Sequence, residues 1–162
     1  MKYTLSKEEQ QEVINLVHQI EIDETNSSYY RRNPVDNRQT KKEAQKQSFG
    51  AEIAFCKLVG ATPDLKLHSK TVLIDTIVNG QKVDIKQTKY FNGKLIVKET
   101  DAKNSPIDIY ALVIGTFPNY DYKGWAYKSE IVQEKNIKNL GYPNSNPYCL
   151  DQDKLHVEEI HG

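Results

Sequence analysis

An Asn-Gly dipeptide at 79–80 constrains this chain more than any other feature, because it joins two β-prone runs, 71–78 and 81–88. Asn-Gly between such runs predicts a β-hairpin with a two-residue type I′ turn. A turn of that length also fixes the register of the two strands. Val78 then faces Gln81, and the residue numbers of every paired couple sum to 159.

Side chains alternate between the two faces of such a hairpin. The face expected to join the core comprises Val72, Ile74, Thr76, Val78, Val83 and Ile85. On the other face Asp75 lies directly opposite Asp84, and Lys86 points the same way. Opposed carboxylates repel each other and destabilise a strand pair, so positive charge must offset them. A divalent cation would do so, since carboxylate oxygens suit Mg²⁺, Mn²⁺ or Ca²⁺.

Two other interpretations of the opposed aspartates stay open at this point. Lys82 and Lys86 can neutralise them on a solvated sheet face without any metal ion. A one-residue bulge would also shift the register and move the two carboxylates apart.

A helix over residues 41–59 is expected to precede the hairpin, with Gly60 as its C-terminal stop. Its apolar face consists of Phe49, Ile53, Cys56 and Val59. Glu52 lies beside this face or partly on it, because it is three residues after Phe49 and four before Cys56. Since an unpartnered buried carboxylate is costly, Glu52 must meet a cation, a hydrogen-bond donor or the edge of a cleft.

The remaining elements are expected to surround the hairpin in one α/β domain with a central mixed β-sheet flanked by helices. Ser6 and Glu9 have the spacing of a capping box that opens a helix running to about residue 22. A polar loop or arm covers 25–40, and a loop rich in Asn, Pro and Gly covers 139–149. Further strands are expected at 94–98, 109–116, 122–128 and 155–160, and a short helix at 129–134.

The composition excludes several classes of protein. With 38% hydrophobic and 27% charged residues, the chain is neither collagenous, nor a disulfide scaffold, nor disordered throughout. It has no apolar run long enough for a membrane span and no apolar segment near its start that would predict secretion. Its two cysteines form no CxxC pair. We therefore expect a cytoplasmic protein that does not enter a membrane.

The net charge of zero conceals an uneven distribution along the chain. Residues 1–24 carry −4, residues 25–98 carry +8 and residues 99–162 carry −4. A basic central segment favours a polyanionic partner, although folding can also mix these charges over a neutral surface. The candidate contacts to nucleic-acid phosphates are the basic residues of the arm and the following helix start: Arg31, Arg32, Arg38, Lys41, Lys42 and Lys46.

Glu52 on a helix, Asp75 on a strand and Asp84-Ile85-Lys86 on the next strand together resemble the PD-(D/E)XK nuclease superfamily. The resemblance covers residues 43–128 and implies a restriction-endonuclease-like core. The chain would then comprise an N-terminal helix and basic arm (1–40), a catalytic core (41–128) and a C-terminal extension (129–162). Three features depart from the family pattern: Ile74 replaces the usual proline, 99–108 leaves room only for a short helix or none, and Gln87 and Tyr90 lack the exonuclease spacing.

The resemblance also implies roles for these residues. Asp75, Asp84 and the main-chain carbonyl of Ile85 would bind Mg²⁺, for which Mn²⁺ would substitute. Glu52 would bind the metal through water or fill a second metal position. Lys86 would orient or deprotonate the attacking water and counter charge in the transition state. The residues themselves add two polar candidates: Gln87 is next to Lys86, although strand alternation points it away, and Asp108 precedes the strand at 109–116, where a capping role is equally open.

The expected function is therefore a magnesium-dependent DNA endonuclease in the cytoplasm of a bacterium or a phage-infected cell. Cutting both strands of DNA would require a homodimer, since the chain has room for one such site. Two other hypotheses remain. The chain could be a nucleic-acid-binding protein that kept the fold without catalysis, or a structural protein with a charged hairpin.

Overall fold

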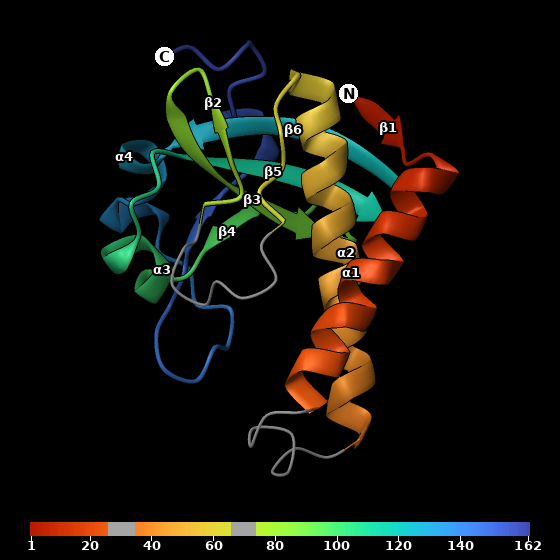
Figure 1. The fold of residues 1–162 in the computed structure, drawn as a ribbon. Helices are drawn as coiled ribbons and strands as arrows, with labels where there is room; N and C mark the ends of the chain where they lie inside the picture. Colours follow the sequence, from red (N-terminus) through yellow and green to blue (C-terminus); the bar gives the residue numbers. More distant parts are fainter. Residues whose placement is uncertain (26–34, 66–73) are drawn as a thin grey trace.

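The computed structural model describes residues 1–25, 35–65 and 74–162, and Figure 1 shows their arrangement. A curled sheet of five strands has the order β1-β6-β5-β3-β2. Only β3 and β5 run parallel, so the sheet is mixed. Its strands are β1 (Lys2–Thr4), β2 (Thr76–Val78), β3 (Gln81–Thr88), β5 (Ile109–Thr116) and β6 (Asn119–Tyr127).

Two long helices, α1 (Lys7–Thr25) and α2 (Val35–Val59), lie side by side against one face of the sheet. Their far ends extend beyond it, as Figure 1 shows. The other face is covered by smaller elements: β4 (Leu95–Val97), β7 (Tyr148–Leu150), α3 (Glu99–Asn104) and α4 (Lys128–Ile131). Strands β4 and β7 pair with each other in a separate two-stranded sheet.

Strand β5 lies at the centre of this architecture and contributes to both cores. Ile109, Ala111 and Val113 pack on the side of α1 and α2. The alternating residues, Tyr110 and Leu112 among them, pack on the side of β4 and α3. Because both faces of β5 are covered, its sequence is a nearly continuous apolar run, as in other buried strands with a parallel neighbour.

The hairpin register is confirmed where β2 is paired. Thr76 faces Val83, Ile77 faces Lys82 and Val78 faces Gln81. The turn residues Asn79 and Gly80 have φ values of 49° and 82°, the left-handed conformation that a type I′ turn requires at both positions.

The expected face alternation is wrong at one residue. Ile74 packs with the cluster on the β4 side and not with Val78, because β2 begins only at Thr76 and the chain before it no longer follows the pleat. Val72 lies outside the described residues.

Three further expectations need correction. The second helix begins at Val35 and not at residue 41, so the end of the expected arm is helical. No strand forms at 155–160, where His156 makes a single isolated bridge to Trp125. Further along, the Ile160 carbonyl accepts a hydrogen bond from the Asn79 side-chain amide. The loop expected at 139–149 ends in β7, which begins at Tyr148.

The N-terminal strand β1 was not expected from its polar sequence. It forms the edge of the sheet beside β6, where Tyr3 faces Tyr120. The terminal amine donates to Asp121 Oδ1 at 3.0 Å and anchors this edge. The capping box of α1 is confirmed by two hydrogen bonds between Ser6 and Glu9, of 2.8 and 3.1 Å. Among the described helices, none is long and apolar enough to cross a membrane.

Gly50 on α2 allows the helix to approach β6. A Cβ at this position would overlap the hydroxyl and ring of Tyr120, whose hydroxyl donates to the Gln47 carbonyl at 2.9 Å. We expect Gly50→Ala to lower the free energy of unfolding by about 1–2 kcal/mol in urea titrations, although alanine is the better helix former. The loss should shrink in a Tyr120→Phe background, which lacks the overlapping hydroxyl. A more stable Gly50→Ala protein would contradict this packing.

Candidate active site

Glu52 occupies the buried side of α2, where it faces the hairpin. Its neighbours Ala51, Ile53 and Phe55 are core residues, and Glu52 itself is only 8% exposed. Burial raises the pKa of Glu52 well above its ordinary value, and the negative charges of Asp75 and Asp84 raise it further. The sequence placed Glu52 beside the apolar face or partly on it; the structure buries it, and its carboxyl group faces other acids.

Asp75 lies where β2 separates from β3. Its N–H still donates to the Val83 carbonyl at 2.9 Å, but its own carbonyl accepts from the N–H of Asp64 at 2.7 Å. Its carboxylate Oδ2 accepts the Ile85 N–H at 2.7 Å. A side chain thus replaces strand backbone as the partner of β3. Because the N–H and C=O of one strand residue point to the same side, the Ile85 carbonyl also faces this gap.

Asp84 follows from the next strand and meets Asp75 directly. Its side chain is buried, and the two carboxyl groups hydrogen-bond to each other. Burial and then the Asp84 charge raise the pKa of Asp75 to about 7. Burial also raises the pKa of Asp84, because the opposing effect of Lys86 only partly compensates. Near neutral pH the pair therefore shares a proton.

Lys86 provides the positive charge beside this pair. Its Nζ lies 2.9 Å from Asp84 Oδ2 and 3.7 Å from Asp101 Oδ2 on α3. Burial alone would lower the pKa of Lys86, but Asp84, Asp101 and Asp75 outweigh it and raise this pKa above its ordinary value. Lys86 is thus a half-buried ammonium ion with two acidic partners.

The cluster has more acid than one lysine can neutralise, and burial, together with neighbouring negative charges, raises the pKa values of Glu52, Asp75 and Asp84. Its donors are all oxygens, the set that Mg²⁺ and Mn²⁺ prefer, so the residues fit a divalent cation. In the described part of the chain, no three His, Cys, Asp or Glu side chains are already arranged as a ligand set. Lys86 and the Ile85 N–H engage the aspartate oxygens instead.

The structure brings neither Gln87 nor Asp108 into this cluster. The Gln87 amide donates to the Gly115 carbonyl on β5 at 2.8 Å. Asp108 Oδ2 accepts the Lys82 N–H at 2.9 Å, so it fastens the start of β3. Both side chains therefore hold the strands that carry the site.

The basic residues expected to contact DNA are partly neutralised by folding. Lys42 Nζ lies 2.6 Å from Glu21 on α1, and Lys46 Nζ lies 3.3 Å from Glu43. Lys41 lies on α2, and so does Arg38, whose side chain is outside the described residues. Arg31 and Arg32 also lie outside them.

Sequence reasoning missed two acids near the site. Asp64 bonds to the Asp75 backbone and raises the pKa of Glu52 through its charge, and Asp101 pairs with Lys86. No sequence spacing relates either residue to the hairpin, because Asp64 lies in the segment after α2 and Asp101 lies on α3.

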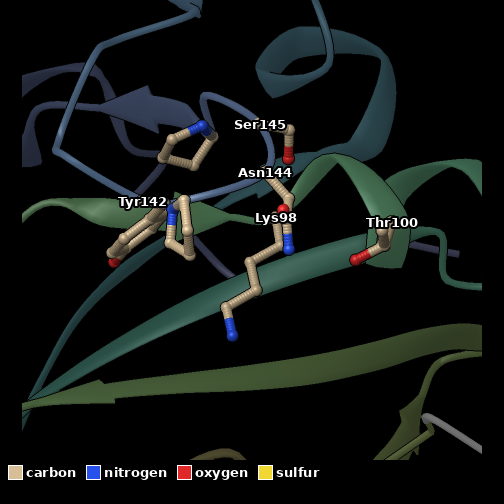
Figure 2. A pocket seen from close by; sticks show the side chains of 7 residues that line it. Lys98, Thr100, Tyr142, Asn144 and Ser145 are labelled. Atoms are coloured by element: carbon tan, nitrogen blue, oxygen red, sulfur yellow. The ribbon is translucent and has the colours of Figure 1, made fainter.

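A hollow of about 370 Å³ also opens beside α3, between Lys98 and the loop that precedes β7. Figure 2 shows the Lys98 side chain extended between Tyr142 and Thr100, with Asn144 and Ser145 beyond it. Its lining contains one cation and neutral polar groups and no acid, so it does not suit a metal ion.

The raised pKa of Asp75 makes stability depend on pH. The native state keeps this proton up to about pH 7, whereas the unfolded chain releases it near 3.8, so its stabilisation is lost as the pH rises between these values. Asp75→Asn keeps the shape without the charge. We expect its stability relative to wild type to rise between these two pH values by on the order of 4 kcal/mol.

Urea unfolding in EDTA across this pH range measures the difference. Asp153→Asn, an exposed change remote from the site, should show no such trend. A difference between wild type and Asp75→Asn that does not vary with pH would contradict the shared proton.

The chain was compared with protein families, curated proteins and solved structures. No protein-family model matches the chain, and no curated protein or solved structure matches it. The arrangement of the acidic cluster and Lys86 is therefore the feature of the chain that indicates a function.

Proposed function

We propose that this chain is a magnesium-dependent DNA endonuclease with a restriction-endonuclease-like core of the PD-(D/E)XK type. The observation that carries the proposal is the convergence of Asp75, Asp84 and Lys86 where β2 separates from β3, with Glu52 facing them from α2. The mixed sheet with helices on one face and small elements on the other is compatible with such a core. The fold alone does not select a function.

Asp75, Asp84 and the Ile85 carbonyl would hold Mg²⁺, and Glu52 would reach it through water or support a second ion. When bound, the ion supplies a Lewis acid for a non-bridging phosphate oxygen and lowers the pKa of a bound water. The excess of acid over cation in the cluster supports this assignment, because a divalent ion would offset both the burial of the carboxylates and the repulsion between them.

The chain's own groups would perform the remaining tasks. Lys86, charged and held by Asp84 and Asp101, would orient the attacking water and counter negative charge on the phosphoryl oxygens. The water oxygen would attack phosphorus in line with the leaving oxygen. Glu52, which faces the aspartates from α2, would accept a hydrogen bond from the water.

The alternative is a nucleic-acid-binding protein of the same fold without catalysis. The Lys86–Asp84 ion pair favours it, because a lysine that already neutralises an aspartate reduces the need for a metal. A homodimer belongs to the enzyme proposal only if the protein cuts both strands, since each chain would carry one site.

Cleavage assays with supercoiled, linear, single-stranded and four-way-junction DNA separate these functions. With Mg²⁺ we expect wild type to cut at least one substrate, and Asp84→Ala and Lys86→Ala each to reduce the rate by at least about 100-fold. EDTA should abolish cutting, and Mn²⁺ should restore it.

Asp153→Asn and Lys154→Ala are matched controls of the same charge types at exposed positions away from the cluster, and they should cleave at the wild-type rate. Full activity in Asp84→Ala would refute the proposal. Absence of cutting on every substrate would favour the binding protein.

The basic arm gives a separate prediction. If Arg31 and Arg32 contact phosphates, replacing both with Gln should weaken DNA binding and reduce the slope of log affinity against log salt by about 1–2. Binding titrations in Ca²⁺ or EDTA at several salt concentrations measure this slope. A slope equal to that of wild type would exclude these two arginines from the DNA contact.

A further inference from the structure

An exposed aromatic pair begins the turn between β3 and β4. Tyr90 is 62% exposed and Phe91 is 82% exposed, which makes Phe91 the most exposed large apolar side chain in the described residues. Single exposed apolar residues are ordinary on protein surfaces, whereas here two consecutive residues each expose an aromatic ring. Neither ring contributes to either hydrophobic core.

The backbone of this turn is held in place. The Gly93 N–H donates to the Tyr90 carbonyl at 3.0 Å. The Gln152 amide donates to the carbonyls of Phe91 and Gly93 at 2.9 and 2.8 Å. The two rings are thus presented on a fixed backbone, so ordering the turn costs little entropy when a ligand binds.

Ammonium groups accompany both rings. Lys89 Nζ lies 5.3 Å from the centre of the Tyr90 ring, and Lys123 Nζ lies 5.8 Å from that of Phe91. Lys123 also pairs with Asp121, whereas Lys89 has no acidic partner in the described part of the chain. Aromatic rings flanked by cations suit a ligand that combines flat apolar groups with negative charge.

A hollow of about 340 Å³ adjoins the Phe91 ring, in the size range of small-ligand sites. Its lining includes Phe91, Tyr3, Tyr120, Ile114, Lys2 and Lys89, and the one acid in its described lining, Asp121, already pairs with Lys123 and the terminal amine. It therefore has room and polarity for a base beside the ring and a phosphate beside the lysines.

We propose that Tyr90 and Phe91 form a stacking platform for unpaired nucleobases. The inference rests on the proposed function and deepens it, because it makes the substrate DNA with a single-stranded segment near the cleaved phosphate. In a duplex the base faces are already stacked, whereas a single strand offers them to aromatic side chains. Four residue-to-residue steps lead from Lys86 on β3 to Tyr90 just beyond its end, which span at most about 14 Å or roughly four base steps.

Binding in EDTA tests the platform without catalysis. The probe is a short oligothymidylate with one 2-aminopurine, whose fluorescence falls on stacking, compared with the same strand in a duplex. We expect wild type to quench the single strand and to bind it more tightly than the duplex. Phe91→Ala should weaken single-strand binding roughly 5- to 150-fold and abolish the quenching.

Three variants sharpen this test. Phe91→Trp should keep the quenching, because it preserves a ring. Val157→Ala removes a similarly exposed apolar side chain elsewhere and should bind like wild type. Lys89→Gln should reduce the salt slope of binding, whereas Phe91→Ala should weaken binding equally at all salt concentrations.

The platform is overturned if wild type does not quench the probe, if Phe91→Ala quenches it normally, or if Phe91→Ala only dissolves a dimer of this chain. Cleavage of duplex DNA with unaltered quenching in Phe91→Ala would sustain the nuclease and reject the platform. Quenching that depends on Phe91, without cleavage of any substrate, would sustain the platform on a binding protein and reject the nuclease.

Discussion

The hydrogen bond from the Ile85 N–H to the Asp75 carboxylate is the contact on which the candidate site depends. It lets β2 separate from β3 while the backbone N–H of Ile85 keeps a hydrogen-bond partner. The same bond fixes the Asp75 side chain beside Asp84, so the acids meet because the strands separate. Continued backbone pairing at this point would remove the gap that the Ile85 carbonyl faces. The irregular start of β2 is thus the feature that makes a polar centre possible inside an apolar sheet.

Folding also changes what the charge distribution along the chain means. Lys57 and Lys42 belong to the basic central segment, yet they pair with Glu9 and Glu21 of the acidic N-terminal segment at 3.4 and 2.6 Å. These ion pairs link α1 to α2. They also neutralise lysines that the charge count along the sequence would leave for a polyanionic partner. Exposed pairs of this kind contribute little free energy, so a phosphate could still compete for the lysines. Lys89, in contrast, keeps its charge available, and its turn directly follows β3, the strand that carries Asp84 and Lys86.

The parts that sequence predicted well are those with local causes. The Asn-Gly turn determines the pairing of Thr76 with Val83, and alternation then assigns Val83 and Asp84 to opposite faces. The parts that it missed depend on contacts between distant residues. β1 forms only because β6 offers an edge, and Asp101 approaches Lys86 only because α3 packs over the sheet. The pattern of the hairpin could predict that Asp75 and Asp84 meet, but not that Asp101 also pairs with Lys86.

The position of Asp101 matters for any cation that enters the cluster. Leaving a half-buried ammonium without a partner is unfavourable, so a lysine bonded to Asp84 alone would resist competitors for that carboxylate. Lys86 has Asp101 at 3.7 Å as well. Asp84 can therefore change partners while Lys86 keeps its charge and a neighbouring acid. An ion pair that neutralises the cluster in the free protein is in this way compatible with a metal centre in the proposed enzyme.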